Sequence, residues 1–190
     1  MRFLSACAVV AFLCCSTLPA QDAPKPELSP VPLTSAQIAV YKAFLADYNK
    51  GSKGKLNLAD TTDSFQPDKD NFTGCMKDFS RSSKSLKVHN LTQALGQDPN
   101  ANLVDIDTYK VKDMGKWMEQ GQTLDTAVDS AISAGLLILS EITFDRTGHY
   151  AAFSYSFHCG NLCGNGATII YKLTNGKWLR TKRFCGYWLS

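Results

Sequence analysis

The last third of the chain has two features that together favour an antiparallel sheet. Residues 149–157 alternate between apolar or aromatic side chains and small or polar ones, as expected for a strand with one buried face. Asn175-Gly176 stands between two further apolar runs, and this dipeptide is the strongest short signal for a two-residue hairpin. We therefore predict a meander of four strands at residues 136–144, 149–157, 167–173 and 178–184.

A helix is expected near the start of the domain. Thr34 and Gln37 have the spacing of a capping box. The apolar positions that follow recur at helical intervals and are Ile38, Tyr41, Phe44, Leu45 and Tyr48. The predicted fold is α+β, with this N-terminal helix packed on the C-terminal antiparallel four-stranded meander in a single domain over residues 34–190.

The middle of the chain carries weaker signals. Residues 55–60 alternate and form a candidate short strand. Short helices are expected around residues 74–80 and 91–95, a loop at 97–102, and a short helix or an ordered loop at 112–121.

The first 20 residues have the layout of a secretory signal peptide. Arg2 precedes a nearly continuous apolar run, and Ala20 is the expected last residue before cleavage. Residues 21–33 are rich in proline and form an extended leader. The apolar run is too short to span a membrane, and no later segment approaches the ~20 apolar residues that a span requires. Export to the periplasm or the extracellular space is therefore expected, without a transmembrane segment.

A lipid-anchored form is the alternative to plain secretion. Leu4-Ser5-Ala6-Cys7 has the composition of a lipoprotein cleavage box, but no apolar stretch precedes it. Cys15 lies at a better depth but follows the bulky Phe12 and Cys14. The secreted form is therefore favoured.

Composition argues against a nucleic-acid partner. The net charge of the sequence is +3, and loss of Arg2 with the signal leaves about +2, too little for strong steering toward nucleic acid or an anionic membrane. Basic residues nevertheless concentrate in the last two predicted strands and are Lys172, Lys177, Arg180, Lys182 and Arg183. Such a face either binds an anionic ligand or protects an edge strand by its charge, and protection is favoured.

The cysteines that remain after the signal peptide are Cys75, Cys159, Cys163 and Cys185. In an exported chain this even number predicts two disulfides, with three connectivities open. We favour Cys159–Cys163 together with Cys75–Cys185.

A metal site is the alternative. It would join Cys159 and Cys163 to His149 and His158, in one version with Cys185, because zinc ligand pairs occur at this spacing. An oxidising compartment disfavours it, and no metal or cofactor is predicted.

The stretch from His158 to Gly166 is predicted to be a rigid, exposed hairpin tip and the contact surface for a partner. Its glycines and asparagines suit the positive φ angles of a tight turn. A phosphate cradle is not expected, because neither a Gly-Lys-Ser/Thr motif nor a predicted helix follows. The residues predicted to make the contact are His158, Gly160, Asn161, Leu162, Gly164, Asn165 and Gly166.

Several motifs resemble those of a group of uncharacterised exported bacterial proteins. They are Asp60-Thr61-Thr62 after a strand, Leu139-Ser140 to Phe144, the Cys-Gly-x-Leu-Cys-Gly loop, the Asn-Gly-Lys-Trp turn and a final Trp-x-Ser. The resemblance is good over residues 139–190 and weak over 37–62. In that group the two loop cysteines can occur alone, which supports pairing Cys159 with Cys163. The resemblance implies no activity.

Three functions of different classes follow from these observations. The favoured one is a non-catalytic module that binds a partner protein or a cell-envelope component through the bridged loop and the sheet. The second is a small secreted hydrolase with its acids in the 96–145 region, where Asp105, Asp107 and Glu141 are candidates, because paired carboxylates can hydrolyse glycosides. The third is a thiol-redox or metal module at Cys159 and Cys163. No catalytic residue is assigned.

Overall fold

The computed structural model describes residues 28–190 except 53, 68, 81–86 and 162. The predicted signal peptide and residues 21–27 of the predicted leader lie outside this part. None of the helices in the described part combines the length and the apolar character that crossing a membrane requires.

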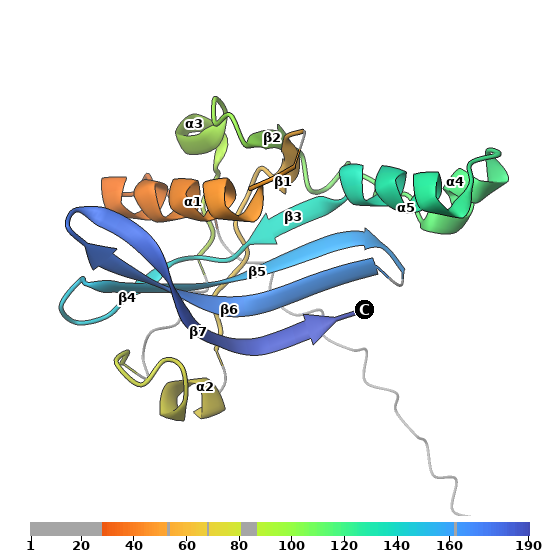
Figure 1. The fold of residues 1–190 in the computed structure, drawn as a ribbon. Coiled ribbons are helices and arrows are strands. Elements are labelled where there is room, and N and C mark those ends of the chain that lie inside the picture. Colours follow the sequence, from red (N-terminus) through yellow and green to blue (C-terminus); the bar gives the residue numbers. More distant parts are fainter. Residues whose placement is uncertain (1–27, 53, 68, 81–86, 162) are drawn as a thin grey trace, which may run out of the picture.

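The described part contains short helices and a large sheet (Figure 1). The helices are α1 Ser35–Tyr48, α2 Lys69–Thr73, α3 Thr92–Leu95, α4 Met114–Glu119 and α5 Leu124–Ser133. The strands are β1 Leu56–Ala59, β2 Ala101–Val104, β3 Leu136–Leu139, β4 Thr143–Phe144, β5 Tyr150–Gly160, β6 Cys163–Thr174 and β7 Lys177–Leu189.

The prediction of an α+β fold is confirmed, but the predicted extent of the sheet is wrong. The four predicted strands do pair antiparallel in chain order, as β3, β5, β6 and β7. The sheet, however, has seven strands in the order β2-β1-β3-β5-β6-β7, with β4 beside β5. It is mixed, because β1 pairs in parallel with both β2 and β3. The parallel part of the sheet was missed because parallel partners are joined through long connections and not by a short turn. A four-residue strand such as β2 also carries little local sequence signal.

The middle of the chain agrees with the predictions in part. The predicted strand at 55–60, helix at 91–95 and helix at 112–121 correspond to β1, α3 and α4. The helix expected at 74–80 is displaced, because α2 ends at Thr73. The loop expected at 97–102 becomes β2 from Ala101 onward. Helix α5 was not predicted.

The predicted strand at 136–144 is interrupted by two buried polar residues, Ser140 and Glu141. The Ser140 Oγ atom accepts a hydrogen bond from the Ser154 backbone N–H (2.8 Å), and the Glu141 N–H donates to the Asp63 carbonyl (2.8 Å). Buried polar groups require partners. At this break Ser140 stays bonded to β5 through its side chain, whereas the Glu141 backbone is bonded to Asp63.

Two local predictions, the capping box of the N-terminal helix and the two-residue hairpin, are confirmed. Thr34 Oγ1 accepts from Gln37 N (3.3 Å), and Gln37 Oε1 accepts from Thr34 N (2.9 Å), which completes the capping box of α1. Asn175 and Gly176 adopt φ angles of 50° and 74° between the paired residues Thr174 and Lys177, as a two-residue type I′ hairpin requires.

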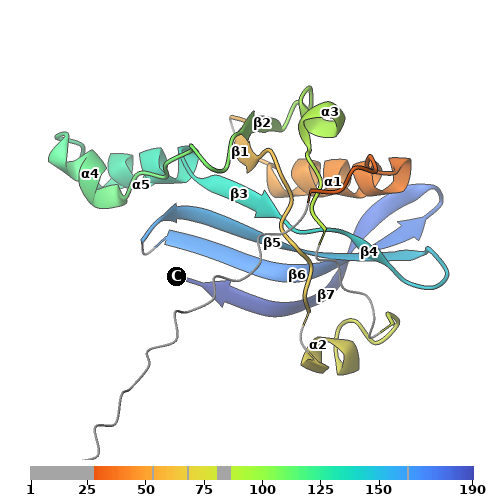
Figure 2. The same ribbon diagram turned by 180° about the vertical axis from the view of Figure 1, so that it is seen from behind.

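Helix α1 covers one face of the sheet, and the segment that contains α2 lies on the other (Figures 1 and 2). Tyr41 and Phe44 of α1 meet Phe153 edge to face, with ring centroids 5.6 and 5.3 Å apart. Burial of each such aromatic side chain contributes about 1.5–3 kcal/mol to the stability of the fold. The opposite face has a smaller core, in which Phe65, Met76 and Phe79 pack with Ala152, Ile170 and Cys185.

Buried tyrosines predict a loss of stability at alkaline pH. Burial raises the pKa of Tyr41 and of Tyr171, and the charges of Glu141 and Asp47 add to the respective shifts. An unfolded tyrosine ionises near pH ~10, so the stabilisation is complete below that pH and is lost as the pH rises above it. We expect the free energy of unfolding to fall by about 1.4 kcal/mol per pH unit and per buried tyrosine.

Ultraviolet absorbance and circular dichroism during an alkaline titration check this. The tyrosinate signal of the buried residues should rise together with the loss of secondary structure. Complete ionisation of all seven tyrosines before any unfolding would contradict the expectation.

Candidate binding groove

The hairpin that carries the Cys159–Cys163 bridge is tighter than predicted. Strand β5 continues to Gly160 and pairs it with Cys163 at the start of β6, after a register shift between His158 and Gly160. Gly160 has a φ of 138°, a conformation that favours glycine. The predicted extent of the hairpin tip, from His158 to Gly166, is therefore wrong: β5 includes His158 and ends at Gly160, and Gly164, Asn165 and Gly166 belong to β6.

The other two glycines of this stretch are explained by packing instead of by turn geometry. In the described part, neither Gly164 nor Gly166 has a positive φ, and both are buried. A Cβ atom on Gly166 would collide with the indole ring of Trp188 and would lie 2.7 Å from the Tyr155 carbonyl oxygen. Glycine thus allows Trp188 of β7 to lie across β6.

Both predicted cysteine pairs are within bonding distance in the structure. Cys159 and Cys163 have Cα atoms 5.0 Å apart, and Cys75 and Cys185 have Cα atoms 5.9 Å apart, both within the usual range for a disulfide. The first bridge joins neighbouring strands at the hairpin tip. The second attaches the segment after α2 to β7 on the opposite face of the sheet.

Asp113 anchors the hairpin tip to α4. It is the N-cap of α4: its Oδ1 atom accepts from Gly115 N (2.9 Å), and its Oδ2 atom accepts from Asn161 N (3.0 Å). These two N–H groups, the one of Asn161 first, lower the pKa of the Asp113 carboxyl. The contact is non-local, and Asp113 was not among the predicted site residues.

Helix α5 lies beside the hairpin and leaves an apolar stripe exposed. Ala127 and Ala131 are buried, whereas Leu124, Val128 and Ile132 are 56, 36 and 51 % exposed. Both sets recur at intervals of four residues, which places each on one side of the helix. This spacing, together with the N-cap Thr123, is a signal from which α5 could have been predicted.

Two adjoining cavities lie between α5 and the bridged hairpin. The inner lobe, of about 370 Å³, is lined by Met114, Val128, Ala131 and the Cys159–Cys163 bridge, with Asp113 at its rim. The outer lobe, of about 380 Å³, shares both cysteines and continues along Leu56, Ile132, Phe157 and Leu189. A third cavity of about 420 Å³ shares Leu56, Ile132 and Phe157 with the outer lobe. We call the inner and outer lobes together the groove.

The predicted contact residues are distributed unevenly around the groove. Gly160 and Asn161 line the inner lobe, and Gly164 and Asn165 line the outer lobe. Asn165 Oδ1 also accepts from the Tyr48 hydroxyl (3.4 Å). Exposed His158 is not among the lining residues of either lobe; it lies beside the Trp188 ring at 5.6 Å and lines a neighbouring polar cavity of about 310 Å³ with Lys116. Leu162 lies outside the described residues.

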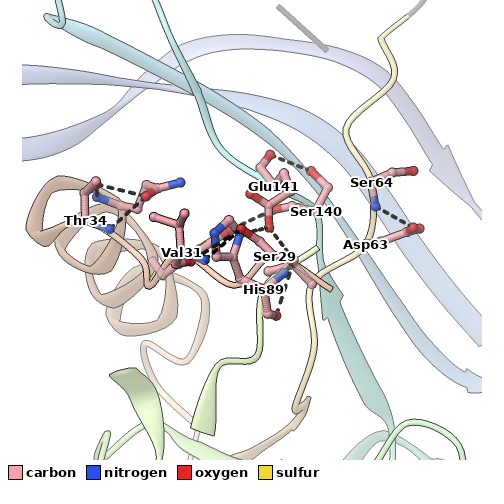
Figure 3. A network of polar contacts seen from close by, with 11 residues as sticks. Ser29, Val31, Thr34, Asp63, Ser64, His89, Ser140 and Glu141 are labelled. Atoms are coloured by element: carbon pink, nitrogen blue, oxygen red, sulfur yellow. Dashed lines mark hydrogen bonds and ion pairs between the residues drawn. The ribbon is translucent and has the colours of Figure 1, made fainter. Parts of the chain in front are cut away.

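A buried carboxylate in contact with a partly buried imidazole lies elsewhere, at the break between β3 and β4. Glu141 Oε1 contacts His89 Nδ1 at 2.8 Å and accepts from the Thr62 hydroxyl at 2.5 Å (Figure 3). The side chains of Glu141 and His89 are 3 and 14 % exposed. The Thr62 proton points to the carboxylate and not to the imidazole, so His89 is not placed to activate this hydroxyl as a general base would.

The structure places the three candidate acids in two different environments. Asp105 and Asp107 occupy an exposed turn after β2, where Asp105 Oδ1 accepts from Asp107 N (2.9 Å). Glu141 is buried and is engaged by Thr62 and His89. An exposed turn and a buried network are not the facing carboxylates that glycoside hydrolysis uses.

The proposed metal ligands are also separated. His149 precedes β5 and Cys159 is near its end, so about 30 Å of extended chain lies between them. The part of the chain that the structure describes contains no group of three or more His, Cys, Asp or Glu residues able to hold a metal ion.

The basic residues of β6 and β7 are partly engaged within the molecule. Lys172 and Arg183 lie over the Tyr150 ring, and Arg183 pairs with Asp78 at 2.6 Å. Strand β7 also pairs irregularly with β6 at two places. Charge and bulges both protect an edge strand, which agrees with the favoured interpretation.

A comparison with protein-family models, curated proteins and solved structures found no match for this chain. The resemblance noted from the motifs therefore stays a prediction.

Proposed function

We propose that this protein is an exported, non-catalytic module that binds a partner or a cell-envelope component in the groove. The observation that carries the proposal is a pair of adjoining apolar lobes of about 370 and 380 Å³ between α5 and the bridged hairpin. Binding sites usually have this size and combine apolar walls with a few polar groups.

The walls of the groove support this function because they are fixed before binding. The Cys159–Cys163 bridge joins the two strands of the hairpin, and Asp113 ties the turn to α4. A wall that is already ordered loses little conformational entropy when a ligand binds. The exposed Val128 and Ile132 side chains contribute apolar surface to the groove, and such surface often marks interaction sites.

Export rests on the signal-peptide layout of residues 1–20. The two cysteine pairs at bonding distance support it, because disulfides persist in oxidising compartments.

A hydrolase is less well supported, since Glu141 is buried within a hydrogen-bonded network.

Charge placed in the groove is expected to weaken binding strongly. In a Val128→Asp, Ile132→Asp variant, an occupant would have to cover two carboxylates, which is costly without a partner. Both positions are partly exposed, so the fold should be retained. Co-sedimentation of the mature protein with envelope material of the host measures binding, and we expect at least a tenfold loss, about 1.4 kcal/mol.

Leu124→Asp is the matched control. Leu124 lies on the same stripe of α5 but is not among the described residues that line either lobe. Equal binding by the wild type and the double variant would refute the groove as the contact site.

A further inference from the structure

We infer that the groove takes the aliphatic chain of a monomeric, single-chain amphiphile. This inference rests on the proposed function and names the chemical class of the ligand. Its first support is the chemistry of the walls. Aliphatic, aromatic and disulfide groups dominate both lobes, and neither has a lysine, arginine or histidine among its described lining residues. The charged Asp113 at the rim has both oxygens engaged by N–H groups.

The second support is that the backbone along most of the groove is already paired. The floor consists of β5 and β6: β5 pairs with β3 as far as His158 and with β6 as far as Gly160, and β6 pairs with β5 and β7. The wall is helix α5, whose backbone is bonded internally. An extended peptide brings an N–H and a C=O group with each residue, and these need partners. A hydrocarbon chain needs none, so the groove suits a chain better than a peptide.

The size of the groove agrees with an acyl-type chain. Each lobe measures about 370–380 Å³, and a methylene is close in size to a water molecule, which takes about 30 Å³ in the liquid. Each lobe therefore accommodates on the order of twelve methylenes. We expect the affinity to rise about three- to fourfold with each added methylene until the lobes are filled.

The polar end of the groove provides a place for a head group. The cavity lined by Lys116 and His158 shares Asp113, Gly160 and Asn161 with the inner lobe. A chain that enters between α4 and the hairpin tip would leave its head among these polar groups, while its tail follows the disulfide toward Phe157 and Ile132.

Titration of the mature protein with cis-parinaric acid, a fluorescent polyene fatty acid, tests the inference. We expect saturable uptake of one probe per chain and displacement by dodecanoate but not by an apolar extended peptide. Val128→Asp and Val128→Phe should each weaken uptake at least tenfold, the first by charge and the second by filling the inner lobe. Leu124→Asp should bind as the wild type does. Circular dichroism verifies that each variant is folded, and Ile132→Asp replaces any variant that is not.

The outcomes separate the inference from the proposed function. Envelope binding that depends on Val128 and Ile132, without probe uptake, overturns the inference and leaves the proposed function standing. Uptake that none of the groove variants changes overturns the inference, because the chain then binds elsewhere. Binding to phosphatidylglycerol vesicles without uptake of monomeric probe also overturns it. Absence of both probe uptake and envelope binding overturns both proposals.

Discussion

Replacing Cys75 and Cys185 together with serine is expected to lower the free energy of unfolding by about 5 kcal/mol. The two cysteines are 110 residues apart in the sequence, and on the chain-entropy account a bridge that closes a loop of this length restricts the unfolded chain strongly. The folded state also depends on this bridge, because it attaches the segment with Phe65, Met76 and Phe79 to the face of the sheet opposite α1. Domains of this size have about 5–15 kcal/mol of stability in total.

The matched control is the Cys159→Ser, Cys163→Ser variant. This bridge spans only four residues, so the same account expects a loss of about 2 kcal/mol. Urea denaturation followed by circular dichroism gives both values. If the two variants lose the same stability, then loop length does not determine what the bridges contribute.

Local signals predicted those parts of the fold whose geometry a few adjacent residues decide. Asn175 and Gly176 both adopt the positive φ that their hairpin needs, and Thr34 with Gln37 completes the cap of α1. The alternation that identified β5 works because one face of that strand packs on α1 while the other meets the smaller core. In each case the information lies within a few residues of the sequence.

Two of the mispredicted features, strand β2 and the bridged hairpin, depend on contacts between distant segments. Strand β2 is defined by parallel pairing with β1, in which Leu56 lies opposite Ala101, and nothing within its four residues specifies that register. The length of the bridged loop was mispredicted for a related reason. The pairing of Gly160 with Cys163 depends on a bulge, and Gly164 and Gly166 are needed by Trp188 of another strand.

The candidate groove was predicted only on its hairpin side. The Cys159–Cys163 bridge followed from export and the even cysteine number, but the opposite wall is α5, which was not predicted. The link between the two sides is the bond from Asn161 N to Asp113 Oδ2, across 48 residues. A single sequence does not show which of its many aspartates makes such a contact.

The contact between the buried Glu141 and the partly buried His89 yields the other large expected effect. Replacing His89 with leucine removes the imidazole that contacts the Glu141 carboxylate at 2.8 Å. Of these two partners, the buried carboxylate would lose the imidazole and keep the Thr62 hydroxyl. Leaving a buried polar group without a hydrogen-bond partner typically costs about 1–3 kcal/mol, and more when the group is charged.

The double variant His89→Leu, Glu141→Met distinguishes the cost of a stranded charge from the loss of the contact itself. Replacing both members of a buried pair with apolar residues of similar volume is often close to neutral. We therefore expect the double variant to be more stable than His89→Leu alone, even though it carries more substitutions. Urea unfolding of the wild type, both single variants and the double variant gives the coupling energy. A double variant that is less stable than either single variant would mean that the network around Thr62 needs the carboxylate itself, since Glu141 Oε1 accepts the hydrogen bond of the Thr62 hydroxyl.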